Sequence, residues 1–269
     1  IAEYILKNYD KAAFMTAAKL GNAVGVSEST VVRFAIEVGF SGYPKLQKAL
    51  QELIKNKLTT VQRLELRNDY FSDGDALKGV LKADMENIRA TLEKINQNTF
   101  QDVVQHIFEA KRIYIIGLRS STALAEFLGF YLNIILQNVK VVSYGISDVF
   151  EQMINVGEGD LVIGIGFPRY AAKTIDALEF SQDRGAKVVA LTDSLLSPLA
   201  TKADYTLIAQ SNMASFVDSL VAPLSVINAL IIAVGMREKE NISNVFSNLE
   251  LIWKNYNVYS INNKNVADD

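Results

Sequence analysis

The chain has 269 residues, of which 49% are hydrophobic and 21% charged, and its formal net charge is −3 at pH 7. This composition supports a packed core and excludes a disordered chain, and the absence of cysteine excludes a disulfide framework and a cysteine nucleophile. The longest apolar run, 220–235, contains a proline and an asparagine and is shorter than the roughly 20 residues that span a bilayer. We therefore expect a cytoplasmic protein with no membrane partner.

Charge is unevenly distributed along the chain. Residues 1–57 hold eight Lys or Arg against five Asp or Glu, a surplus of three, which leaves a net charge of −6 on the remainder. A basic segment in an acidic chain indicates that the two parts meet different partners, the first of them a polyanion.

Apolar periodicity predicts four helices in the basic part, at 1–9, 16–24, 27–38 and 43–57. The junction between the second and the third is very short. Gly25 stands where a helix C-cap glycine belongs, and Ser27 stands where an N-cap binds the free amides of the next helix. The sequence therefore predicts two helices joined by a tight turn.

The third predicted helix has two different faces. Val31 and Phe34 share a side that can contact Leu20 and Val24 of the preceding helix, which gives a small three-helix core. The residues predicted to point outward are Glu28, Ser29, Val32, Arg33 and Ile36. An exposed helix after a tight turn is the geometry that brings side chains to base edges in the major groove of DNA.

We expect this third helix to contact base edges or phosphates and the fourth to position the DNA backbone. The candidate DNA-binding residues are Ser27, Glu28, Ser29, Thr30, Arg33, Lys45 and Lys48. The alternative is an ordinary helical domain in which Ser27 only caps its helix and Arg33 is solvated.

Residues 58–97 are predicted to form a linker and connecting helices, and the pattern then changes to short apolar runs that alternate with helices. The predicted strands are 112–117, 139–145, 160–167, 187–193 and 204–209, and the predicted helices are 75–96, 98–109, 121–137, 148–155, 171–184, 215–236 and 242–257. Alternation of this kind predicts a parallel five-stranded sheet flanked by helices. The expected fold class is an all-α helix-turn-helix domain followed by an α/β domain.

Ligands of an open parallel sheet bind beyond the carboxyl ends of its strands, where loop amides and helix N-termini favour an anion. The first strand is followed by "GLRSSTALAEF" (117–127), with a glycine that permits close approach and two serine hydroxyls. The third is followed by "GFPRYAAKT" (166–174), whose Arg169 can hold a phosphate or carboxylate bidentately. The alternative is that the serines cap a helix and that Arg169 pairs with Asp193 or Asp218.

Catalysis finds little support in the sequence. The only histidine, His106, precedes the first predicted strand, and we expect it to be a surface or interface residue rather than a general base. No His/Asp/Glu cluster shows metal-ligand spacing, so we predict no catalytic residue, metal or cofactor. Glu126 and Glu151, near loops of the sheet, keep a sugar-phosphate isomerase with an accessory helical domain as the alternative function.

The stretch "VSESTVVRFAIEVGFSGYPKLQKAL" (26–50) resembles the helix-turn-helix domain of the RpiR/MurR family of bacterial transcription regulators, which is usually joined to a C-terminal sugar isomerase (SIS) domain. The resemblance implies a DNA-binding domain at 1–57, a linker at 58–97, a SIS domain for sugar-phosphate sensing and dimerisation at 98–257, and a tail at 258–269.

The resemblance also implies ligand-binding residues. Residues 117–127 match the first phosphate-holding loop of SIS domains, and Thr174 matches the end of the second, whereas "FPRY" (167–170) departs from the serine- and glycine-rich turn common there. The candidate ligand-binding residues are Gly117, Arg119, Ser120, Ser121, Arg169, Tyr170 and Thr174.

We therefore expect a transcriptional regulator, not an enzyme, that binds a double-stranded DNA operator. Its SIS domain is expected to sense a small anionic metabolite, a phosphosugar or related sugar derivative. Because one helix-turn-helix makes few contacts, tight operator binding predicts a homodimer or a higher homo-oligomer. A SIS domain that only dimerises and binds no ligand is the third possibility.

Overall fold

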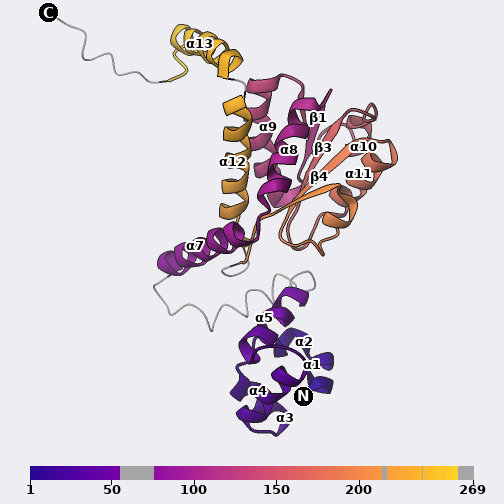
Figure 1. The fold of residues 1–269 in the computed structure, drawn as a ribbon, viewed down its shortest axis with the longest axis vertical. Helices are drawn as coiled ribbons and strands as arrows, with labels where there is room; N and C mark the ends of the chain where they lie inside the picture. Colours follow the sequence, from indigo (N-terminus) through magenta and orange to yellow (C-terminus); the bar gives the residue numbers. More distant parts are fainter. Residues whose placement is uncertain (55–75, 214–216, 238, 260–269) are drawn as a thin grey trace, which may run out of the picture. The chain divides into compact units, whose positions relative to one another are not determined.

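The computed structural model describes residues 1–54, 76–213, 217–237 and 239–259 (Figure 1). The chain forms two compact units. The first comprises Ile1–Glu86, Phe167–Tyr170 and Ser211–Ser219, and the second comprises Asn87–Gly166, Ala171–Gln210 and Leu220–Asp269.

The first unit begins with five short helices. They are α1 (Ala2–Lys7), α2 (Tyr9–Ala12), α3 (Ala17–Val24), α4 (Glu28–Glu37) and α5 (Tyr43–Ile54). The single helix predicted at 1–9 is wrong, because Asn8 leaves the helical region with φ −130° and ψ 41° and separates α1 from α2. Its side-chain amide donates to the carbonyl of Tyr4, a local bond that competes with the helix. The other three predicted helices are confirmed, and residues 55–57 of the last lie outside the described residues.

The core of this helical unit lies between α3, α4 and α5. Leu20, Val31 and Ala35 are fully buried, and Val24 and Phe34 pack against them, which confirms the predicted contact between the two helices. Val32 was predicted to point outward but packs partly buried on the same cluster.

α5 is fixed to the segment that joins α2 and α3 by side-chain hydrogen bonds. The Tyr43 hydroxyl donates to the carbonyl of Met15 at 2.7 Å, and Gln47 Nε2 donates to the same oxygen at 2.9 Å. These bonds pair a carbonyl near a helix end, which intrahelical bonds leave unsatisfied. Burial raises the pKa of Tyr43 to about 12.

The second unit is built on a sheet in which every strand pairing is parallel. Its strands are β1 (Ile113–Ile116), β2 (Val139–Val142), β3 (Leu161–Ile165), β4 (Lys187–Thr192) and β5 (Tyr205–Ile208), in the order β2-β1-β3-β4-β5. The predicted five-stranded parallel sheet is thus confirmed. β1 and β3 are buried along their whole length, as expected for central strands covered on both faces.

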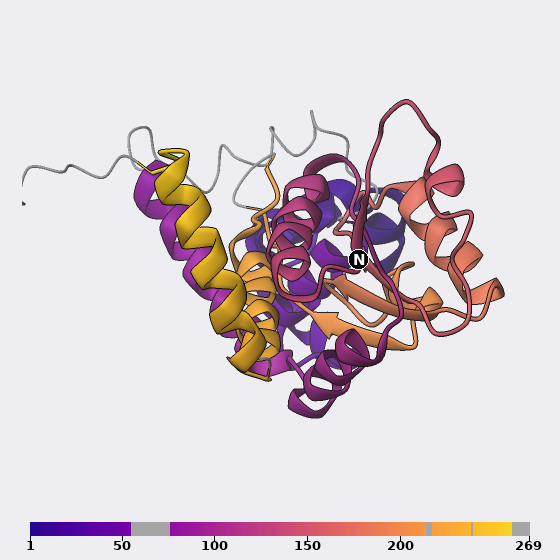
Figure 2. The ribbon, with the colours of Figure 1, turned by 90° about the horizontal axis from the view of Figure 1, so that it is seen from above.

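Helices cover both faces of this sheet. The helices of this part of the chain are α7 (Ala76–Lys94), α8 (Gln97–Glu109), α9 (Thr122–Leu136), α10 (Val149–Gln152), α11 (Ala172–Asp183), α12 (Val221–Arg237) and α13 (Lys239–Asn255), with the 3-10 turns η2 (Arg119–Ser121) and η3 (Ala200–Lys202) between them. α13 packs on α9 and α12. α9 packs on β1 and β2, α8 packs on β5, and α12 lies against both helices. α11 packs on β3 and β4 from the opposite side, and Figure 2 shows salmon α11 and orange α12 on opposite sides of the strands.

Two helix boundaries differ from the sequence expectation. α12 begins at Val221 rather than at 215, which places Pro223 in the first turn, where a proline is tolerated. α10 is shorter than the predicted 148–155, and Asp148 and Glu151 close its N-terminus as a capping box. Six residues of the apolar run at 220–235 are buried, namely Ala222, Pro223, Val226, Ile227, Leu230 and Val234.

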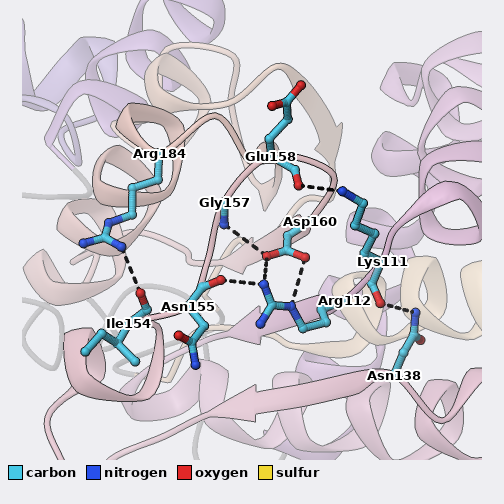
Figure 3. Close-up of polar contacts among 9 residues, drawn as sticks. All are labelled: Lys111, Arg112, Asn138, Ile154, Asn155, Gly157, Glu158, Asp160 and Arg184. Carbon is cyan, nitrogen blue, oxygen red and sulfur yellow. Dashed lines mark hydrogen bonds and ion pairs between the residues drawn. The ribbon is translucent and has the colours of Figure 1, made fainter.

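An ion pair joins the amino ends of β1 and β3 (Figure 3). The Arg112 guanidinium donates to the Asp160 carboxylate twice, at 3.1 and 2.9 Å, and also to the carbonyl of Asn155. The carboxylate, 1% exposed, further accepts the backbone N–H of Gly157 at 3.0 Å. This bidentate bond raises the pKa of Arg112.

Within the part of the chain that the structure describes, no single helix is both long and apolar enough to cross a membrane. α12 and α13 meet that test only when taken together as a bent pair.

Candidate functional site

The turn between α3 and α4 is held by backbone contacts. Gly25 ends α3 in the left-handed region at φ 77°, as a C-cap glycine does, and the N–H of Val26 donates to the carbonyl of Gly21 at 2.9 Å. A Cβ on Gly21 would lie 2.7 Å from the carbonyl oxygen of Val26. Sequence reasoning missed this role of Gly21, since its only signal is a glycine inside a helical pattern.

Hydroxyl groups gather at the first turn of α4. Ser27 is the N-cap, and its Oγ accepts the N–H of Thr30 at 3.3 Å. The same Oγ lies 2.8 Å from both Ser29 Oγ and Thr30 Oγ1. The predicted cap is therefore present, and all three hydroxyls remain exposed.

The other predicted DNA-binding side chains also lie at the surface. Glu28 and Arg33 are exposed on α4, on the side away from buried Val31 and Ala35, and Lys45 and Lys48 are exposed on α5. Ile36 is 56% exposed on the same outer face as Arg33. This unit thus presents hydroxyl and cationic groups on a short helix that a tight turn holds.

In the second unit, the two predicted ligand loops start at one edge of the sheet. β1 and β3 are adjacent and parallel, with Ile116 opposite Gly164, so their carboxyl ends coincide. The first loop leads into α9 and the second into α11, whose N-termini carry the positive ends of the helix dipoles. The arrangement is one that favours an anion.

The loop after β1 is tightly folded. A Cβ on Gly117 would lie 2.7 Å from the carbonyl oxygen of Ser121, so only glycine fits there. Arg119 is exposed and adopts φ 60°. Ser121 stands at the N-cap of α9 but makes no side-chain cap hydrogen bond, so the alternative in which it caps this helix is not supported. Ser120 is exposed.

The loop after β3 combines a buried beginning with an exposed arginine. Gly166, Phe167 and Pro168 are buried, whereas Arg169 is exposed at φ 66° and Tyr170 is half-buried. Residues in this region of φ other than glycine carry backbone strain, which concentrates at functional sites. Each predicted ligand loop therefore contains one strained arginine, a feature that the sequence did not reveal.

Thr174 lies in the first turn of α11 and is 1% exposed. Its Oγ1 has no hydrogen-bond partner among the residues that the structure describes. Such buried hydroxyls are nearly always paired with protein, water or ligand. Next to it, Lys173 forms an ion pair with Asp148, and this hydrogen bond lowers the pKa of Asp148 and raises that of Lys173.

The side chain of His106, expected at the surface or at an interface, is 23% exposed, and its Nδ1 lies 3.5 Å from Glu109 Oε2. Its Nε2 lies 3.0 Å from the Tyr205 hydroxyl, and the two rings are 4.9 Å apart. Tyr205 is the first residue of β5, so this histidine lies toward the amino edge of the sheet, opposite the ligand loops. Among the described residues, no group of three His, Cys, Asp or Glu is placed to hold a metal ion.

Two family models match the chain. Residues 1–57 match a helix-turn-helix domain of the rpiR family, and residues 106–233 match the SIS domain. An HTH-type transcriptional regulator of Caldanaerobacter subterraneus subsp. tengcongensis is 26% identical over 92% of this chain and 88% of its own length. The regulator HexR of Pseudomonas aeruginosa is 25% identical over 88% of this chain and 83% of its own.

Solved structures give the same picture. The sugar isomerase domain of an RpiR transcription factor from Sphaerobacter thermophilus is 31% identical, with a TM-score of 0.63, and the match covers 65% of this chain and 98% of that domain. The NanR protein of Vibrio vulnificus, solved in complex with ManNAc-6P, shares the fold with a TM-score of 0.61 at 21% identity, over 97% of this chain and 92% of that one.

Proposed function

Since the chain belongs to the rpiR family of transcriptional regulators, in which a helix-turn-helix domain accompanies a SIS domain, we propose that it binds a double-stranded DNA operator through α4 and senses a small anionic metabolite at the carboxyl edge of its sheet. The metabolite that fits best is a phosphosugar or related sugar derivative.

The observation that carries the DNA-binding part is the outer face of α4. Exposed Arg33 and the hydroxyls of Ser27, Ser29 and Thr30 point away from the helical core, and a guanidinium matches the two acceptors of a guanine edge. Lys45 and Lys48 supply point charges for phosphates.

A gel shift with labelled DNA from the upstream region of the protein's own gene tests this part. The expected result is a complex that survives competition by unrelated DNA at the same salt concentration. Equal affinity for the two DNAs would contradict operator binding.

The effector part rests on Thr174 and on the two loops. The buried hydroxyl in the first turn of α11 has no partner in the described part of the chain, which leaves an interaction that a ligand oxygen can satisfy, and an anion there also meets helix-end amides. Arg119 and Arg169 add cationic groups in strained loops, of a kind that bind phosphate or carboxylate bidentately. The phosphosugar in the NanR structure supports this class of ligand.

Thermal-shift screening with phosphorylated sugars, the parent sugars and inorganic phosphate tests the effector part. We expect a phosphorylated sugar to raise the unfolding midpoint and the parent sugar not to do so. Thr174→Val is the matched variant, because it removes the hydroxyl and keeps the shape. The same midpoint shift in this variant would contradict a role of Thr174 in ligand binding.

We further propose that the SIS domain binds its metabolite without converting it. His106 is held by Tyr205 toward the amino edge of the sheet, away from the ligand loops, which leaves the carboxyl edge without an imidazole base. The relatives named as transcriptional regulators support the same view.

We propose a homodimer as the DNA-binding form, with α9 and α12 of the second unit in the interface. These two helices pack together and expose large apolar side chains, namely Phe130, Tyr131, Ile232 and Met236, at 60%, 36%, 61% and 64%. Apolar patches of this kind mark interaction surfaces.

Light scattering on a Phe130→Glu/Met236→Glu variant tests the assembly. We expect the wild type to be dimeric and this variant monomeric. We expect Leu196→Glu, a charge on a 91% exposed leucine outside these two helices, to stay dimeric. A dimer that survives the double change would place the interface elsewhere.

A further inference from the structure

Gln210 connects the end of the sheet to α7. It follows β5, is 4% exposed, and donates its backbone N–H to Thr91 Oγ1 of α7 at 2.8 Å. Its side-chain Nε2 donates to the carbonyl of Asp193 at 2.9 Å, while its Oε1 accepts from Lys94 Nζ at 3.4 Å. One buried residue thus binds α7 at two points and the end of β4 at a third.

Hydrogen bonds continue from this residue back to the second ligand loop. The N–H of Gly166, where that loop begins, donates to the carbonyl of Leu191 in β4 at 3.1 Å. At the end of β4, the carbonyl of Thr192 accepts the N–H of Ala209 at 2.8 Å. A contiguous path therefore runs from the loop after β3 through β4 to Gln210 and α7.

α7 spans the boundary between the two units along the chain, because the first unit includes Glu86 and the second begins at Asn87, and it is the first described helix after α5. Its buried side chains are polar, with Asn87 at 1% and Thr91 at 6% exposure. Its large apolar side chains are exposed, among them Leu81, Ile88 and Leu92 at 54%, 41% and 76%. Hydrogen bonds, rather than apolar burial, therefore hold this helix on the sheet, and such bonds depend strictly on geometry.

We propose that Thr91 and Gln210 form a positioning pair that couples the ligand-binding edge of the sheet to α7, and through it to DNA binding. A small displacement of the carboxyl ends of β4 and β5 weakens the bonds between Gln210 and α7, since a hydrogen bond weakens steeply with angle and distance. The proposal rests on the proposed function, because a coupling of this kind has meaning only in a protein that binds both a metabolite and DNA.

The first test needs no metabolite. Thr91→Val removes the acceptor and keeps the volume, Gln210→Ala removes the side-chain bonds, and Thr91→Ser keeps the hydroxyl. We expect Thr91→Val and Gln210→Ala to speed amide hydrogen exchange in residues 88–94 by about tenfold or more, and Thr91→Ser to restore slow exchange. Thr206→Val, the same change on β5 without a bond to α7, is the matched control and should leave exchange unchanged. If hydrogen exchange in α7 were unchanged in both Thr91→Val and Gln210→Ala, the proposed positioning role of the pair would be contradicted.

The second test measures coupling. The affinity for the upstream DNA is determined with and without N-acetylmannosamine 6-phosphate or D-glucose 6-phosphate, for the wild type, both single variants and the double variant. We expect the ligand-induced change in affinity to fall at least about threefold in each single variant and no further in the double variant, because residues in one network are not additive. Thermal-shift midpoints should show that both variants still bind the ligand.

The outcomes separate the two ideas. Independent, additive effects of the two changes, or a full ligand response in both variants, would overturn the coupling while leaving the proposed function intact. If neither sugar phosphate alters DNA binding of the wild type, the sensing function is contradicted and the proposed coupling fails with it, whereas the hydrogen-exchange result still decides whether the pair holds α7.

Discussion

Gly21 and Val26 are in close backbone contact: the Val26 N–H donates to the Gly21 carbonyl at 2.9 Å. A Cβ on Gly21 would lie only 2.7 Å from the Val26 carbonyl oxygen, so the contact leaves no room for a side chain at position 21. The backbone of the turn therefore lies directly on α3, and the start of α4 follows from that contact. Any side chain at position 21 forces this turn outward.

We predict that Gly21→Ala destabilises the helical unit by about 1–3 kcal/mol, the usual cost of overpacking, and weakens operator binding because α4 shifts. Chemical denaturation and gel shifts measure the two effects. Gly25→Asn is the matched control, because position 25 has open space and asparagine tolerates its left-handed φ of 77°. Equal stability of Gly21→Ala and the wild type would contradict the close contact.

For DNA recognition, we predict that Arg33→Ala weakens specific binding by about 1–3 kcal/mol, the range for a bidentate base contact. Lys48→Ala, by contrast, should weaken specific and nonspecific binding alike and reduce the salt dependence, because it removes a phosphate contact. Gel shifts at several salt concentrations distinguish the two. If Arg33→Ala bound the operator with wild-type affinity, the proposed contact between Arg33 and a base would be contradicted.

We predict that the helical unit loses stability as pH rises from 10 toward 12. Burial raises the pKa of Tyr43 from 10.0 to about 12, so below pH 10 both folded and unfolded states keep the proton. Between the two values the unfolded state has lost its proton and the folded state retains it, so the free energy of unfolding decreases with pH.

Tyr43→Phe provides the comparison for this pH effect. It should cost about 0.5–1.5 kcal/mol at neutral pH through the lost bond to Met15, whose carbonyl still accepts from Gln47. Thermal unfolding should then show a smaller drop above pH 10 than in the wild type. Parallel pH curves for the two proteins would contradict the assignment to Tyr43.

For the effector site, we predict that Arg169→Gly lowers metabolite affinity by about 1.5–3 kcal/mol, the range for a lost charge-assisted bond. Glycine accepts the φ of 66° without strain, so the protein should stay folded and bind DNA as before. Calorimetric titration with the phosphosugar that shifts the unfolding midpoint measures the loss. Unchanged ligand affinity in the folded variant would show that the anion binds elsewhere.

Local pattern was sufficient to predict much of this protein. The tight turn before α4 follows from Gly25 and Ser27, because capping depends on a few neighbouring residues, and the buried face of α4 follows from the spacing of Val31 and Phe34. The five strands likewise follow from short apolar runs between helices. The break at Asn8 was missed, because one local hydrogen bond outweighed the helical periodicity on either side of it.

Only the tertiary structure decided which distant residues meet. The sequence places Arg112 and Asp160 at the start of two predicted strands, but their ion pair depends on β1 lying beside β3. Likewise, no local signal links Thr91 to Gln210, which are 119 positions apart. Periodicity and capping report interactions within a few residues, whereas strand order and ion pairs between distant residues arise when packing brings remote segments together. The same holds for the burial of the Thr174 hydroxyl, which has no hydrogen-bond partner among the described residues.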